Sequence, residues 1–160
     1  MPKLFRRNNP SAFTIIEIVV AVGVLGLACA ATMQVLLRMN QNAALSRLRT
    51  GAGTVAQNHI DYLLSIQPFN PQRAPAQIPP ELAIGTTDTG SDSNPTVPIY
   101  KDPISGEVSV YGWRRTVIKR IDQQVNGVNI ELRSAAVTVS YRFRGRPLSV
   151  TMSTLRTSDI

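Results

Sequence analysis

Cysteine and histidine each occur only once among the 160 residues. The lone Cys29 excludes an intramolecular disulfide, and its place in an apolar run is typical of a small buried hydrophobe. His59 has no second histidine and no available thiol with which to share a metal ion, so we expect a packed or half-exposed imidazole. The motifs present form no catalytic triad, metal cluster or phosphate-binding loop. We therefore expect a protein that is not an enzyme and that carries no cofactor or metal.

Charge and proline are both missing from long stretches near the start of the chain. No charged side chain occurs between Ile18 and Ala31, and the apolar run continues to Leu37, which gives the ~20 residues that a helix needs to cross a bilayer. No proline occurs between Ala12 and Pro68. One helix can therefore run from about residue 14 to about residue 66, a length of roughly 80 Å. The sequence predicts that residues 13–37 form its membrane-spanning half.

Acidic residues are absent from positions 1–12, which carry Lys3, Arg6 and Arg7. By the positive-inside rule this basic leader stays in the cytoplasm and the C-terminal domain lies on the other side of the membrane. A conventional secretory signal is the competing interpretation, because small residues follow Cys29 where such a signal would be cut. That cut would leave the carboxylate of Glu17 without an explanation.

Glu17 lies inside the apolar run. A carboxylate in a membrane helix costs ~2.5–3.5 kcal/mol on insertion scales, and such a residue therefore usually has a partner. One interpretation places Glu17 at the membrane edge, where it reaches the lipid headgroups. The other gives it a positive partner in an assembled state, and the nearest candidate is a new amino terminus made by a cut just before Phe13.

The residues around that position form a pattern with fixed offsets, Ser11-Ala12-Phe13-Thr14-Ile15-Ile16-Glu17-Ile18. This segment resembles the processing motif of type IV pilins and type II secretion pseudopilins. The resemblance implies that a prepilin peptidase cuts between Ala12 and Phe13 and methylates the new amine of Phe13. It also makes Glu17 the fifth residue of the mature chain, with a role in assembly. The family usually has glycine where this chain has Ala12, and alanine is the smallest side-chain alternative, so we expect cleavage.

The resemblance also implies a location and partners. The chain would be a single-pass protein of the bacterial inner membrane with its C-terminal domain in the periplasm. It would then join other pilins or pseudopilins in a pilus or a secretion pseudopilus. The C-terminal strand pattern is most similar to minor pilins and the I-type minor pseudopilin.

Residues 38–67 change from uniformly apolar to amphipathic. Apolar residues recur there at steps of three and four, with His59 among them, which predicts a helix with one apolar face. The recurring positions are Leu45, Leu48, Ala52, Val55, Leu63 and Ile66, widened by Ala56, Ile60 and Leu64. This face needs a cover, and the C-terminal strands are the only candidate. Gly51 and Gly53 within it indicate either a bend or a close contact.

Residues 68–106 begin with Pro68 and Pro71, which end the helix. We expect an extended proline-rich segment there, followed by a polar loop from Gly85 to Pro98. Asp88, Asp92 and Asn94 in that loop are candidate calcium ligands, but their spacing fits no EF-hand. A solvated loop is therefore the preferred interpretation.

Residues 107–160 alternate between apolar and polar positions, which is typical of strands with one buried face. Strands are predicted at 107–121, 135–143 and 148–153, with a hairpin at Arg144-Gly145-Arg146-Pro147. A further short strand fits Val128 to Leu132, after a turn at Asn126-Gly127. The predicted fold is α+β and pilin-like: a long N-terminal helix packed on a small antiparallel sheet of three or four strands.

Two other functions stay open. Trp113, Arg114, Arg115, Lys119 and Arg120 form a basic cluster with an aromatic residue, which can hold nucleic-acid phosphates. The chain would then be a DNA-binding minor pilin, although a solvated strand face is the plainer interpretation. The third possibility is a plain single-pass membrane-anchored domain, which needs no cleavage after Ala12.

Overall fold

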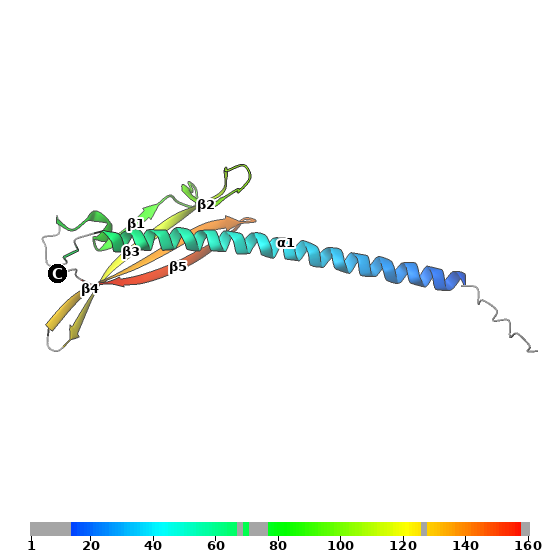
Figure 1. Ribbon diagram of the computed structural model, residues 1–160, viewed down its shortest axis with the longest axis horizontal. Helices are drawn as coiled ribbons and strands as arrows, with labels where there is room; N and C mark the ends of the chain where they lie inside the picture. Colours follow the sequence, from blue (N-terminus) through cyan, green and yellow to red (C-terminus); the bar gives the residue numbers. More distant parts are fainter. Residues whose placement is uncertain (1–13, 67–68, 71–76, 126–127, 158–160) are drawn as a thin grey trace, which may run out of the picture. The chain divides into compact units, whose positions relative to one another are not determined.

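The computed structural model describes residues 14–66, 69–70, 77–125 and 128–157. The elements, in chain order, are α1 (Ile15–Ser65), the short 3-10 helix η2 (Pro80–Leu82), β1 (Gly85–Thr89), β2 (Val97–Lys101), β3 (Val108–Val125), β4 (Val128–Phe143) and β5 (Arg146–Arg156) (Figure 1). The chain divides into two parts inside α1, one ending at Ala43 and one beginning at Ala44. Below, residues 14–43 are the apolar part and residues 44–157 the sheet part.

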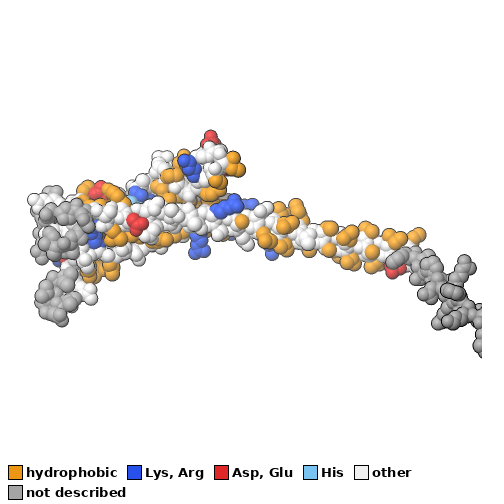
Figure 2. Space-filling view, viewed as in Figure 1, with side chains coloured by type: hydrophobic (Ala, Val, Ile, Leu, Met, Phe, Trp, Pro, Cys, Tyr) orange, Lys and Arg blue, Asp and Glu red, His pale blue; other side chains and the backbone are white. Residues whose placement is uncertain are grey.

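The apolar part is a helical segment whose side chains are exposed almost throughout. Every described residue from Thr14 to Asn40 is exposed, and hydrophobic side chains are spread along this segment in Figure 2. The helix is long and apolar enough to cross a membrane once. The predicted membrane-spanning half is therefore consistent with the structure.

The sheet part uses one face of α1, and this face is the predicted apolar stripe. The buried residues follow steps of four and three and are Leu48, Ala52, Ala56, Ile60 and Leu63. Leu64, which the pattern placed on the margin of the stripe, is 40% exposed. Ala52 and Ala56 are fully buried, and their small side chains let the helix backbone approach the sheet closely.

The sheet is antiparallel, with five strands in the order β1-β3-β4-β5, and β2 also pairs with β3. β1 and β2 lie end to end along the same edge of β3: Gly85 is opposite Ile118, and Val97 is opposite Gly112. Both strands fall in or near the segment for which a polar loop was predicted, so that prediction is wrong for residues 85–89 and 97–98. β1 has the sequence Gly-Thr-Thr-Asp-Thr and is mostly exposed. It is held by backbone pairing with β3, and no apolar alternation marks it.

The C-terminal hairpin is confirmed. β4 ends at Phe143, which pairs with Arg146, and Arg144 and Gly145 between them have positive φ angles of 52° and 78°. Two consecutive left-handed residues are the signature of a type I′ turn, which matches the twist of the strands it joins. The short strand suggested after residue 127 is the beginning of β4, and the Asn126-Gly127 turn lies outside the described residues.

The core lies between α1 and the sheet. Val137, Val139 and Tyr141 of β4 are buried and face the helix, as the alternation predicted. Leu148, Val150 and Met152 of β5 are partly buried against the same cluster. The predicted α+β fold, a long N-terminal helix on an antiparallel sheet, is confirmed.

Candidate functional site

Glu17 lies in the first turn of α1, and Thr14 caps this turn. The backbone N–H of Glu17 donates to the Thr14 hydroxyl at 3.3 Å and to the Thr14 carbonyl at 3.0 Å. Thr14-x-x-Glu17 is the spacing of a capping box, in which the N-cap hydroxyl accepts a bond from the third helical residue. A carboxylate in a first turn is also favoured by the helix dipole. The Thr14 hydroxyl therefore caps the start of this helix, and the helix dipole favours the Glu17 carboxylate at this position.

The other two residues of the predicted processing site, Ala12 and Phe13, lie outside the described residues. Cleavage between them and methylation of Phe13 stay predictions. Among the described residues, no cation lies within the 4.0 Å ion-pair distance of the Glu17 carboxylate. The predicted assembly role of Glu17 requires a partner from another chain, and it too stays a prediction.

The large apolar side chains of the apolar part present an unusual surface for a soluble protein. Ile15 is 84% exposed and Leu27 is 74% exposed, and comparable residues occur on all sides of the helix. A continuous apolar surface of this length is unfavourable in water. It needs a cover, and lipid tails or the apolar helices of other chains can provide one.

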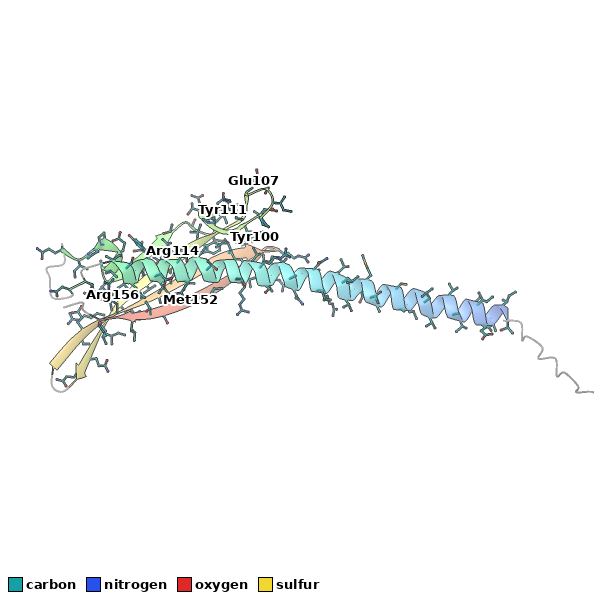
Figure 3. All side chains as sticks on the ribbon, viewed as in Figure 1. Tyr100, Glu107, Tyr111, Arg114, Met152 and Arg156 are labelled. Carbon is teal, nitrogen blue, oxygen red and sulfur yellow. The ribbon has the colours of Figure 1, made fainter. Side chains whose placement is uncertain are left out.

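The C-terminal end of α1 is held by Arg156 of β5, a residue that the sequence analysis missed. Its guanidinium donates to the carbonyl oxygens of Leu63 and Ile66, and it lies 5.2 Å from the ring centroid of Phe69 (Figure 3). The last carbonyls of a helix lack intrahelical donors and carry partial negative charge. A guanidinium there supplies the missing donors and balances the negative end of the helix dipole. The sequence could have indicated that Arg156 is buried, because it lies on the same alternating face of the strand as Val150 and Met152.

The predicted nucleic-acid cluster is divided by the alternation of β3. Trp113, Arg115 and Lys119 project from one face of the strand, and Arg114 and Arg120 project from the other. Arg115 forms an ion pair with Asp88 at 2.8 Å, and Arg120 forms one with Asp122 at 2.7 Å. The structure therefore does not bring the five residues together, and carboxylates neutralise two of the four cations.

Two of the three candidate calcium ligands, Asp88 and Asp92, bind arginines, whereas the backbone N–H of Asn94 donates to Ser91. Asp88 accepts from Arg115, and Asp92 accepts from Arg142 of β4 with an Oδ1···Nε distance of 2.6 Å. These hydrogen bonds hold the pKa of each carboxyl below its usual value of 3.8. In the part of the chain that the structure describes, no group of three His, Cys, Asp or Glu side chains is placed to hold a metal.

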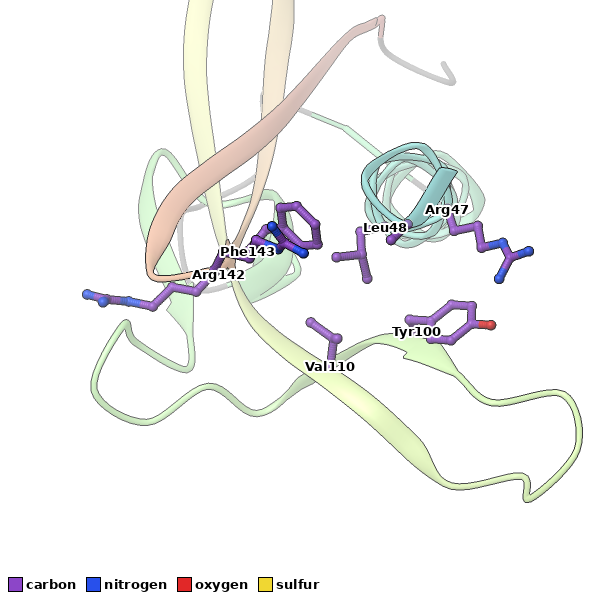
Figure 4. Close-up of a pocket in the computed structure, with 8 residues that line it drawn as sticks. Arg47, Leu48, Tyr100, Val110, Arg142 and Phe143 are labelled. Atoms are coloured by element: carbon purple, nitrogen blue, oxygen red, sulfur yellow. The ribbon is translucent and has the colours of Figure 1, made fainter. Parts of the chain in front are cut away.

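An apolar groove of about 370 Å³ lies between α1, β2, β3 and the C-terminal hairpin (Figure 4). Leu48, Val110, Tyr100 and Phe143 line it, and arginines stand around them. One of these is Arg144 of the hairpin turn, whose guanidinium lies 5.8 Å from the Phe143 ring centroid. Such a groove can receive an apolar side chain of another molecule, with a carboxylate beside it.

The fold and these sites define a class. A long apolar N-terminal helix that continues onto an antiparallel sheet is a pilin-like architecture. Comparisons with protein-family models, with curated proteins and with solved structures found no match. The class therefore rests on the architecture of the chain itself.

Proposed function

We propose that this protein is a minor structural subunit of a type IV pilus or of a type II secretion pseudopilus. The observation that carries the proposal is the apolar part of α1, which exposes large hydrophobic side chains on every side. In the inner membrane lipid tails cover this surface. In a filament the helices of neighbouring subunits replace the lipid, so one segment serves as both anchor and assembly element.

Processing precedes assembly in this proposal. Prepilin peptidase removes residues 1–12 and methylates Phe13, and the C-terminal domain stays in the periplasm until the subunit enters the filament. The amine of Phe13 then meets the Glu17 carboxylate of a neighbouring subunit in an apolar bundle. Breaking such a buried pair from one side costs about 3–5 kcal/mol, so the pair fixes the register of the subunits.

The DNA-binding alternative has less support, because Arg114 and Arg120 project from the opposite face of β3 to Trp113. A plain membrane-anchored domain has the same apolar helix but needs neither a cut after Ala12 nor a partner for Glu17. Processing and incorporation into filaments therefore separate it from the proposed subunit.

The test compares two substitutions of Glu17 in the full chain expressed in its native host. Glu17→Leu removes the charge and the polar side chain at the third position of the capping box, whereas Glu17→Gln removes the charge but keeps a side chain that suits this position. If the charge directs assembly, both variants should be cut normally yet be depleted from sheared filaments. Mass spectrometry reports the cut, and immunoblotting of membrane and filament fractions reports incorporation.

Ile18→Leu is the control, because it changes the adjacent helical residue without changing charge or apolar character. It should enter filaments like the unmodified chain. Normal incorporation of cleaved Glu17→Leu would remove the assembly role. If Glu17→Gln is normal and Glu17→Leu is not, Glu17 acts through the helix cap instead. A mature chain that begins after residue 31 would identify the segment as a secretory signal and overturn the proposal.

A further inference from the structure

A second hollow of the sheet part, separate from the apolar groove, has a volume of about 240 Å³. Polar side chains from α1, η2, β1 and β3 surround it, and Arg114 lies on the same face of β3 as the buried Thr116 and Ile118. Its lining residues are His59, Tyr62, Glu81, Thr87, Arg114 and Thr116. We name it the Arg114 hollow.

Arg114 is a partly buried cation that forms no ion pair with any of the described residues. Its Nη2 donates to the neutral hydroxyl of Thr89 at 3.2 Å, and its Nε is buried without an acceptor. No carboxylate among the described residues lies within 4.0 Å of it. Arg115, by contrast, is exposed and still has Asp88 as its partner. An unpaired cation that has lost part of its hydration is unfavourable, and an anion in the hollow would offset that cost.

The remaining groups determine how much negative charge the hollow can accept. Burial, and then the charge of Arg114, lower the pKa of His59 below 6.5, so the imidazole is neutral at pH 7. The Glu81 side chain also lines the hollow, and its Oε1 accepts from the Tyr62 hydroxyl at 3.4 Å. The site thus offers one strong cation and several hydroxyls. A ligand with one negative charge fits it, whereas Glu81 would repel the second charge of a doubly charged ligand.

We propose that the Arg114 hollow binds a single carboxylate group, held by the Arg114 guanidinium and by the hydroxyls of Thr87 and Thr116. A guanidinium is planar and matches a carboxylate in shape and in its paired hydrogen bonds. A doubly charged phosphate fits less well, because it would meet Glu81 with only one cation to balance it. The carboxylate belongs either to a Glu or Asp side chain of another protein or to a free small molecule. This inference is independent of leader cleavage and filament assembly.

His59 provides the test, because it is the one histidine of the chain and its NMR signal needs no assignment. The full chain in detergent micelles is titrated with sodium acetate, with sodium chloride at equal ionic strength as the reference. A bound carboxylate offsets the charge of Arg114, so the pKa of His59 should rise with acetate and then saturate. A blocked peptide with a single Glu among uncharged residues forms the second arm. Tighter binding of this peptide indicates a protein side chain as the source, and equal binding indicates a free carboxylate.

Two substitutions remove one charge each from adjacent positions of β3. Arg114→Gln should abolish the response to acetate, whereas Arg115→Gln, on the opposite face, should keep it. Arg114→Lys keeps the charge without the planar fork and should weaken the response. If Arg114→Gln fails to fold, the weaker response of Arg114→Lys tests the same role of Arg114. The inference is overturned if acetate and chloride act alike on the unmodified chain, or if the response persists in Arg114→Gln.

Discussion

At the scale of single residues, the arginines of the sheet part differ in what balances their charge. Arg115 and Arg142 are exposed and bind Asp88 and Asp92, and exposed ion pairs of this kind contribute little to stability. Arg156 is 7% exposed, and it donates to the carbonyl oxygens of Leu63 and Ile66 at the end of α1. Burial makes this arrangement sensitive to change, because a buried carbonyl such as that of Leu63 loses free energy when its hydrogen-bond donor is removed.

Replacing Arg156 with methionine should therefore be costly. Arg156→Met keeps much of the volume but leaves the carbonyls of Leu63 and Ile66 without the guanidinium. Since hydrogen bonds to a charged group are each worth about 1.5–3 kcal/mol, we expect the free energy of unfolding to fall by about 3 kcal/mol. Urea denaturation measures this. Arg146→Met, at the exposed start of the same strand, should stay within about 0.5 kcal/mol of the unmodified protein, and equal effects would contradict the role given to Arg156.

His59 links stability to pH. Its pKa in the folded chain lies below the ordinary 6.5 because of burial and of Arg114. Between these two values the unfolded chain binds more protons than the folded chain, so the free energy of unfolding falls as the pH falls through this interval. The stabilisation is fully present above pH 6.5. The lowered pKa values of the aspartates start from 3.8 and act in a more acidic range.

His59→Gln should remove this dependence, because glutamine does not titrate. Urea unfolding at several pH values on both sides of 6.5 should give a slope for the unmodified chain and a nearly flat line for the variant. A slope of the same size in both would assign the effect to another group. The charged and titratable groups that line the same hollow are Tyr62, Glu81 and Arg114.

At the scale of elements, two glycines of α1 have different surroundings. A Cβ on Gly51 would lie 2.2 Å from the backbone oxygen of Ile99 in β2, whereas a Cβ on Gly53 would meet only the end of the Met152 side chain at 3.7 Å. Gly51 therefore marks a close contact between the helix and β2. Gly53 carries the cost of glycine in a helix without the same steric need.

The two alanine substitutions should consequently change the free energy of unfolding in opposite directions. Gly53→Ala should raise the free energy of unfolding by up to about 1 kcal/mol, the difference in helix propensity. Gly51→Ala gains the same propensity but forces α1 away from β2, and overpacking of this kind costs about 1–3 kcal/mol. Thermal and urea denaturation of both variants measure these changes in the free energy of unfolding. A stabilised Gly51→Ala would show that the contact with Ile99 relaxes freely.

The elements also show what the sequence can and cannot predict. The ends of α1 and the hairpin at Arg144 follow from proline spacing and turn chemistry, which are local. β1 was missed because its Thr-rich sequence buries no apolar face and depends on pairing with β3, which is distant in the sequence. The basic cluster of β3 was assembled from neighbours in sequence, although strand alternation separates Arg114 from Arg115. The partners of Arg114 and Arg156 come from other elements, so only the fold reveals them.

At the scale of the whole molecule, the two parts of the chain differ in where their apolar residues lie. Every buried hydrophobic residue among those described belongs to the sheet part, beginning at Leu48. The apolar part contributes none of them, and its large side chains are exposed from Ile15 to Met39. The core of the sheet part is thus complete without the residues before Ala44, and the apolar surface that needs a lipid or protein cover lies almost wholly in the other part.

A chain that begins at Ala44 should therefore fold by itself and be soluble without detergent. Its circular dichroism should show cooperative unfolding, and light scattering after size exclusion should give one monomer. The full chain should need detergent or lipid for the same result, because its exposed helix associates in water. Ile60→Asp is the matched control: it places a charge in the core of the shortened chain, so cooperative unfolding should be lost or strongly weakened. Aggregation or non-cooperative melting of the chain from Ala44 would mean that the helix before it contributes to the fold and is more than an anchor and assembly element.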